Sequence, residues 1–140
     1  MKYLDTNIII YAIENNPKYG KSCKKILLDI ESNKVKVCAS ILVLSEIINA
    51  LSKINNLLRN ERKKELNVEN NINAILSLPI TWLDLNFYVI KRASSYDYKI
   101  SGADYTHVAT MELNSINEII TADEDFNKVS ILKRIDPLDY

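Results

Sequence analysis

Short apolar runs alternate along the sequence with longer stretches of helical periodicity, and this alternation constrains the fold more than any other feature. Residues 1–4, 35–39, 80–83 and 118–121 are predicted strands, with helically spaced apolar side chains in the segments between them. Strands separated by about ten or more helical residues are joined as parallel βαβ units with right-handed crossovers. We therefore expect an α/β fold with a central, mainly parallel sheet and helices on both faces.

The remaining elements follow from spacing and from capping residues. The segment 54–78 is polar and rich in asparagine, and its scattered leucines and isoleucines predict one or two amphipathic helices. Ser40 is expected to cap a helix that ends near Lys53. No repeat and no linker rich in glycine, serine or proline divides the 140 residues, so one domain over residues 1–140 is expected. The other predicted elements are helices over 8–11, 19–30, 85–96 and 101–113, a helical turn over 123–127 and an edge strand over 129–132.

Composition excludes some classes of protein. The 18 basic and 18 acidic residues give a formal net charge of zero, which argues against a protein that holds nucleic acid by bulk charge. Cys23 and Cys38 lack the spacing of a metal site and are expected to be free thiols in a reducing compartment. No apolar run is long enough for a leader or a membrane span, so a cytoplasmic protein is expected.

Four carboxylates stand where a ligand site of such a fold is expected. Asp5 and Asp123 directly follow predicted strands, Asp104 lies in the first turn of a predicted helix, and Glu46 lies about two turns into another. In open parallel sheets, ligands bind outside the carboxyl ends of the strands. The three aspartates also have a structural explanation as helix caps or capping-box residues. Glu46 is harder to explain in that way, because it interrupts the apolar stretch ILVLSEII.

If the four carboxylates converge, their charges require compensation. Two unit charges about 4 Å apart repel by roughly 4 kcal/mol at an effective dielectric constant of 20. Protonation or a bound cation relieves this repulsion, and an all-oxygen site suits Mg²⁺ or Mn²⁺. Carboxylate-bound Mg²⁺ supports hydrolysis of phosphodiesters by activating water. We therefore expect metal-assisted hydrolysis, with Asp5, Asp104 and Asp123 as metal ligands and Glu46 as a fourth catalytic acid.

Neighbouring polar side chains are candidates for supporting roles. Thr6, Asn7 and Thr121 flank the acids and are able to position them, although capping and turn roles explain them equally well. His107 stands three residues after Asp104, so it lies beside it on a helix. It could orient the carboxylate or meet substrate, but a surface or half-buried structural histidine is expected. With this single histidine and no glycine-rich phosphate loop, a Ser-His-Asp triad and P-loop chemistry are unsupported.

Four segments carry a resemblance to a known family. YLDTNIII, LVLSEI, SGADYTHVATM and IITADEDF resemble, in order and spacing, the PIN-domain ribonucleases, specifically the VapC-type toxins of type II toxin–antitoxin pairs. The resemblance implies a three-layer α/β/α fold with about five strands and Mg²⁺- or Mn²⁺-dependent endoribonuclease activity. It places Asp5, Glu46, Asp104 and Asp123 at the acidic positions of the family. It further implies Thr121 as the hydroxyl beside the last aspartate, Asp125 as an acid that some relatives use, a homodimer, and an antitoxin whose tail enters the acidic cleft.

Contacts with RNA are less clearly indicated. Either of two basic clusters could bind phosphates, although a solvated helix face is the more common meaning of such runs. The clusters are Arg59, Arg62, Lys63 and Lys64, and Lys21, Lys24 and Lys25.

Other functions stay open to different degrees. A phosphatase of the haloacid dehalogenase type needs a second acid two residues after its nucleophile, where Asn7 stands. A receiver domain needs an aspartate at the end of a central strand and a lysine after a later strand, and the sequence has no clean match to this pattern. An RNA-processing PIN nuclease that is not a toxin would look much the same, whereas a non-catalytic PIN domain that binds RNA or protein should have lost one or more acids.

Overall fold

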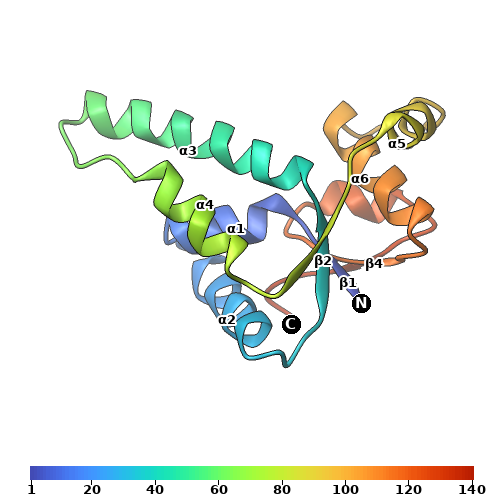
Figure 1. Ribbon diagram of the computed structural model, residues 1–140, viewed down its shortest axis with the longest axis horizontal. Coiled ribbons are helices and arrows are strands. Elements are labelled where there is room, and N and C mark those ends of the chain that lie inside the picture. The colour runs from blue at the N-terminus through green and yellow to red at the C-terminus, as the bar shows by residue number, and fades with distance from the viewer.

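The computed structural model describes residues 1–140 as an α/β/α sandwich built on one sheet (Figure 1). The strands lie in the order β3-β2-β1-β4-β5, and every neighbouring pair is parallel. The predicted mainly parallel sheet of about five strands is thus confirmed. The strands are β1 (Lys2–Leu4), β2 (Val37–Ser40), β3 (Ile80–Leu83), β4 (Glu118–Ile120) and β5 (Lys133–Ile135).

Six α-helices and one 3₁₀ helix flank the sheet. In Figure 1 the first four helices gather on one side of the strands, with α5 and α6 on the other, and α3 extends far beyond the sheet. No helix is long and apolar enough to cross a bilayer. The helices are α1 (Thr6–Ile13), α2 (Gly20–Glu31), α3 (Leu42–Asn60), α4 (Val68–Leu76), α5 (Phe87–Ala93), α6 (Gly102–Leu113) and η1 (Glu124–Lys128).

Alternation along the strands produces the two faces of the sheet. Leu4 and Ala39 belong to a core cluster with buried side chains of α1, α2, α3 and α4. Their neighbours Tyr3 and Cys38 belong to a second cluster with side chains of α6 and η1. Because successive side chains of a strand point to opposite faces, short strands with apolar residues at every position are buried on both sides.

Three predicted elements had the wrong boundaries. The segment 129–132 is not the edge strand, because Val129 is buried and its backbone N–H turns back to Phe126, so the chain reaches the sheet four residues later as β5. The helix after Ser40 continues to Asn60 instead of Lys53. Ser40 itself ends β2, although its hydroxyl still accepts a hydrogen bond from Leu42 N–H. The helix predicted over 85–96 is only the seven-residue α5.

The polar segment 54–78 resolves into the end of α3, a loop, and α4. Asn55 is buried there and pins the loop, because its amide donates to the Leu66 carbonyl at 2.9 Å and accepts from the Leu66 N–H at 2.7 Å. Asn67 then caps α4 by accepting from Asn70 N–H. The asparagines of this segment thus fix a helical hairpin.

Candidate active site

An acidic cavity of about 250 Å³ lies at the carboxyl ends of the central strands. Leu4 and Ile120 are aligned in neighbouring strands, so the residues that follow them, Asp5 and Thr121, emerge side by side. The side chains of all four predicted acids line the cavity, and no lysine or arginine does. The lining residues are Asp5, Thr6, Asn7, Ile10, Tyr11, Glu46, Asp104 and Asp123.

Asp5 is the most buried of the four acids and is also a helix cap. Its side chain accepts hydrogen bonds from Thr6 N–H at 2.8 Å, from the Asn7 amide at 3.1 Å and from the Thr121 hydroxyl at 2.6 Å. Burial raises the pKa of Asp5, and the charge of Asp104 adds to that rise against the lowering effect of the Thr121 bond. The capping explanation therefore holds for Asp5, and it coexists with a place in the cavity.

Asn7 and Thr121 tie the turn that carries Asp123 to the start of α1. The Asn7 amide donates to the Thr121 hydroxyl at 3.0 Å and accepts from Ala122 N–H at 3.3 Å. The Thr121 hydroxyl in turn accepts from Asp123 N–H at 3.0 Å. These bonds hold residues that follow two different strands in one fixed arrangement.

Glu46 reaches the cavity from α3, where two donors hold one of its oxygens. The Thr6 hydroxyl donates to Oε1 at 3.0 Å, and His107 Nε2 lies 2.5 Å from the same oxygen. Burial alone would raise the pKa of Glu46, but the hydrogen bonds from His107 and Thr6 outweigh it and place the pKa below its usual value. Glu46 is thus stabilised as a carboxylate.

The sequence predicted a surface or half-buried histidine at position 107. This prediction was wrong, because His107 is completely buried. Its two ring nitrogens both have partners, Glu46 on one side and the Tyr3 hydroxyl on the other, which makes burial of the ring tolerable. It does not line the cavity itself.

Asp104 is half-buried at the start of α6. The Ser101 hydroxyl donates to its Oδ2 at 2.7 Å, while Asp104 N–H donates back to that hydroxyl at 3.4 Å. Burial raises the pKa of Asp104, and the charges of Asp123 and Glu46 raise it further. The predicted crowding of charge is therefore present at this residue.

Three of the four acids share a pattern in which one carboxylate oxygen is anchored and the other is free. Glu46 Oε1, Asp104 Oδ2 and Asp123 Oδ1 accept hydrogen bonds from protein groups, whereas Glu46 Oε2, Asp104 Oδ1 and Asp123 Oδ2 accept none. An anchored oxygen fixes the direction in which the free one points.

The donor set fits a hard divalent cation. It consists of carboxylate oxygens with raised pKa values at Asp5 and Asp104 and no basic residue in the lining. No three of these side chains are gathered tightly enough to enclose a bare ion. Mg²⁺ normally keeps several waters and takes only one or two carboxylates, so a partly hydrated ion matches this spacing.

The remaining predicted residues lie outside the cavity. Asp125 follows Asp123, and its side chain pairs with Lys128 at 2.7 Å. The basic cluster stands at the far end of α3: Arg59 is 13 positions from Glu46, roughly 20 Å at 1.5 Å per residue. Of its other members, Arg62 and Lys64 lie in the loop, while Lys63 pairs with Glu61 as Arg59 does with Glu65. An RNA-binding role for this cluster stays a prediction.

Two residues near the site were missed from the sequence. Arg134 of β5 donates to the Ala122 carbonyl at 3.3 Å and to Asp136 at 2.7 Å, and so supports the turn before Asp123. No local pattern marks it. Tyr11 lines the cavity four positions after Asn7, and helical spacing would have found it.

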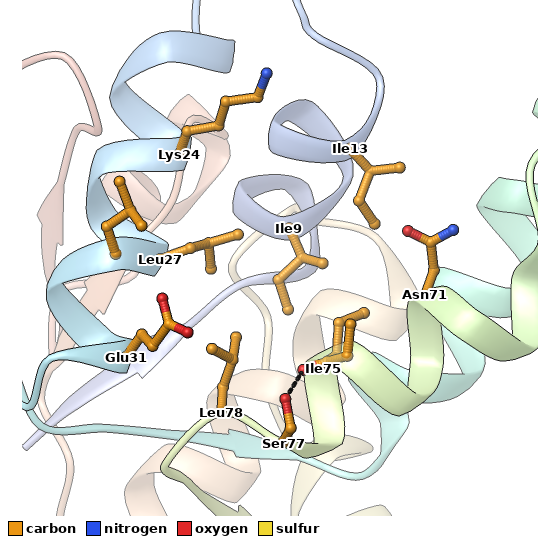
Figure 2. A pocket seen from close by; sticks show the side chains of 11 residues that line it. Ile9, Ile13, Lys24, Leu27, Glu31, Asn71, Ile75, Ser77 and Leu78 are labelled. Atoms are coloured by element: carbon orange, nitrogen blue, oxygen red, sulfur yellow. Dashed lines mark hydrogen bonds between the residues drawn. The ribbon is translucent and has the colours of Figure 1, made fainter.

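A second, larger pocket of about 420 Å³ lies between α1, α2 and α4 (Figure 2). In Figure 2 Ile9, Leu27 and Leu78 point toward one another across it. Most of its lining is apolar, with Lys24 and Glu31 as its only charged members. It lacks the convergent polar groups that chemistry requires, so we do not assign it as the active site.

The parallel sheet and the acidic cavity at its carboxyl edge define an α/β protein with an acidic active-site candidate. The PIN-domain family model matches residues 2–132, so the chain belongs to the PIN-domain family, a family of nucleases. This confirms the resemblance drawn from the four motifs. No curated protein matches the sequence.

Solved structures share the fold at low sequence identity. A toxin–antitoxin complex from Klebsiella pneumoniae is 18% identical, with a TM-score of 0.67 and 98% of each chain covered. VapBC2 from Rickettsia felis, bound to a promoter DNA fragment, is 22% identical, with a TM-score of 0.66 and 96% of this chain and 98% of that chain covered. VapC20 from Mycobacterium tuberculosis, a toxin that cleaves the sarcin–ricin loop, is 18% identical, with a TM-score of 0.68 and coverage of 93% and 95%.

Proposed function

We propose that this protein is a metal-dependent endoribonuclease that hydrolyses RNA phosphodiester bonds and acts as the toxin of a toxin–antitoxin pair. The observation that carries the proposal is the convergence of Asp5, Glu46, Asp104 and Asp123 on one cavity without a lysine or arginine to neutralise them. Such a cluster is unfavourable by itself, and a divalent cation resolves the repulsion. A fold that retains it at the ligand-binding edge of its sheet is suited to chemistry on phosphates.

Each side chain has a distinct part in this proposal. Asp5, Asp104 and Asp123 would hold a partly hydrated Mg²⁺ or Mn²⁺, one or two of them directly and the rest through its waters, and the bound ion would polarise the phosphate and lower the pKa of an attacking water. Glu46, kept ionised by its hydrogen bonds, would orient that water and accept its proton. Thr121 would hold Asp5 and the turn before Asp123 in place.

The structural relatives support the partner part of the proposal. Several were solved as toxin–antitoxin complexes, and two of them with DNA. VapC20 is described as a toxin that cleaves the sarcin–ricin loop, which is an example of RNA cleavage on this fold. We therefore expect an RNA substrate and an antitoxin protein as partner, while the homodimer implied by the family resemblance stays a prediction.

The test is cleavage of a mixed RNA pool by purified, antitoxin-free protein in Mn²⁺, Mg²⁺ or EDTA. Cleavage should require the metal and should disappear in the Asp5→Asn variant. Asp125→Asn is a matched control, because Asp125 is a neighbouring acid that lies outside the cavity. Metal-dependent cleavage retained in Asp5→Asn would refute the assignment of the site. No cleavage by folded wild-type protein under any condition would favour a non-catalytic PIN domain.

A further inference from the structure

Two buried polar residues lie behind the cavity without lining it. Tyr3 of β1 and His107 of α6 are both fully inaccessible to solvent, and Tyr3 belongs to the apolar cluster on the α6 face of the sheet. An apolar pair would fill this space without the desolvation cost of three polar atoms. Their arrangement therefore requires a reason other than packing.

The two residues form a continuous chain of hydrogen bonds that ends on Glu46. Ser40 N–H donates to the Tyr3 hydroxyl at 3.1 Å, the hydroxyl lies 2.6 Å from His107 Nδ1, and His107 Nε2 lies 2.5 Å from Glu46 Oε1.

The direction of the chain follows from the acceptors within reach of Tyr3. His107 Nδ1 is the only acceptor within hydrogen-bonding distance of the Tyr3 hydroxyl, so the single proton of that hydroxyl is directed to Nδ1. Nδ1 is then an acceptor, and the ring proton lies on Nε2, where it is donated to Glu46. The Tyr3 hydroxyl thus sets the tautomer of the histidine and, through it, the partner of the carboxylate.

Only one oxygen of Glu46 is engaged in this way. Oε1 accepts from His107 and from the Thr6 hydroxyl, whereas Oε2 accepts no hydrogen bond from the protein. A glutamate side chain has several rotatable bonds and loses considerable freedom when it is fixed. Two donors on one oxygen remove that freedom before any ligand arrives.

We propose that Tyr3 and His107 are positioning residues, which hold Oε1 of Glu46 so that Oε2 faces the reacting water in the cavity. The inference rests on the proposed nuclease function and deepens it. It assigns these two residues no contact with RNA or metal. They act only through the orientation of Glu46.

Two substitutions of His107 separate the two ends of the chain. His107→Gln keeps an amide N–H near the position of Nε2 and so preserves a donor to Glu46. His107→Asn places its amide near the position of Nδ1 and loses that donor. We expect His107→Asn to lower kcat about 10–100-fold with little change in KM for RNA, and His107→Gln to restore much of it.

Two further variants, one at Tyr3 and a control at Thr110, separate positioning from stability. Tyr3→Phe removes one hydroxyl without changing the ring and should lower kcat by about tenfold. Thr110→Val removes another fully buried hydroxyl of α6, which bonds only to the Thr106 carbonyl. It should leave kcat unchanged at a comparable loss of stability. Wild-type kcat in both Tyr3→Phe and His107→Asn would overturn the proposal, as would an equal loss in Thr110→Val.

A spectroscopic readout is independent of activity, because His107 is the single histidine of the chain. Its ring ¹⁵N resonances in metal-free protein should show Nε2 protonated and Nδ1 unprotonated, and Tyr3→Phe should move the Nδ1 resonance. A proton on Nδ1 in the wild type would overturn the proposal. If the wild-type protein neither cleaves RNA nor is stabilised by Mn²⁺, the proposed function is overturned instead, together with the positioning role that rests on it.

Discussion

The acidic cavity and the apolar pocket lie on two faces of the same helix. In α1, Asn7 and Tyr11 line the cavity, whereas Ile9 and Ile13 line the pocket. The pocket is larger, about 420 Å³ against about 250 Å³, yet seven of its eleven lining residues are hydrophobic. The smaller site is lined by four carboxylates, and a network of side-chain hydrogen bonds surrounds it. The volume of a pocket therefore does not identify the candidate active site in this protein. The convergence of four carboxylates without a neighbouring lysine or arginine does.

The two sites also differ in how they relate to stability. Apolar side chains around the pocket stabilise the fold by leaving water. Burial raises the pKa values of Asp5 and Asp104, and repulsion among the acids of the cavity adds to both rises. One region is thus favourable as it stands, and the other is expected to become favourable with the proposed cation.

The largest effect is expected for Asp104→Asn. Cleavage should fall by about 10²–10³-fold, because a group that binds at the reacting centre is lost. The free energy of unfolding without metal should stay unchanged or rise, since repulsion with Asp123 and Glu46 is removed. Leu28→Glu, at an exposed position of the apolar pocket, should retain full cleavage. If Asp104→Asn unfolds the protein instead, Asp104 is a structural cap.

Divalent metal should stabilise the wild type by mass action. At a Mn²⁺ concentration of about 100 times Kd the gain is about 2.7 kcal/mol, which thermal unfolding in Mn²⁺ and in EDTA measures directly. Asp104→Asn should lose most of this gain, and Leu28→Glu should keep it. Equal metal responses in all three proteins would show that the cation binds elsewhere.

A buried polar residue with a structural task should behave in the opposite way. Asn55→Ala removes both hydrogen bonds to Leu66 in the α3–α4 hairpin and leaves that backbone unpaired. We expect a loss of about 1–3 kcal/mol in the free energy of unfolding, with kcat intact at temperatures where the variant is folded. Chemical denaturation checks the first quantity and RNA cleavage the second. A lower kcat in folded Asn55→Ala would couple the hairpin to the site.

The smallest effect is expected for Glu112, a carboxylate that is already paired with the guanidinium of Arg92. Hydrogen bonds from Arg92 and Tyr96 hold the pKa of Glu112 at about 2, against an ordinary value of 4.5. A lowered pKa stabilises the folded state fully above pH 4.5, and that stability is lost as the pH falls toward 2. Because both partners are partly exposed, the contribution is about 0.5–1 kcal/mol. The stability difference between wild type and Arg92→Ala should shrink over this window, and a constant difference would contradict the assignment.

The sequence by itself determined the layout of the fold and the four acids of the cavity. Alternating strand and helix signals predicted the parallel sheet, because the crossover rule leaves few alternatives. The acids after the strands were predicted to converge, and the structure places Asp5, Glu46, Asp104 and Asp123 in one cavity. Their catalytic roles stay predictions.

Only the tertiary structure decided which side chains hold the acids. Tyr3 and His107 are 104 positions apart and meet across the interface between β1 and α6, and Arg134 reaches Ala122 from the neighbouring strand. Periodicity describes which face of an element is apolar, but it does not pair atoms from distant elements. His107 was expected to be a surface or half-buried histidine, but it is fully buried, and each of its ring nitrogens has a partner from another element. Hydrogen bonds between distant elements depend on angstrom-scale packing, which no local pattern encodes.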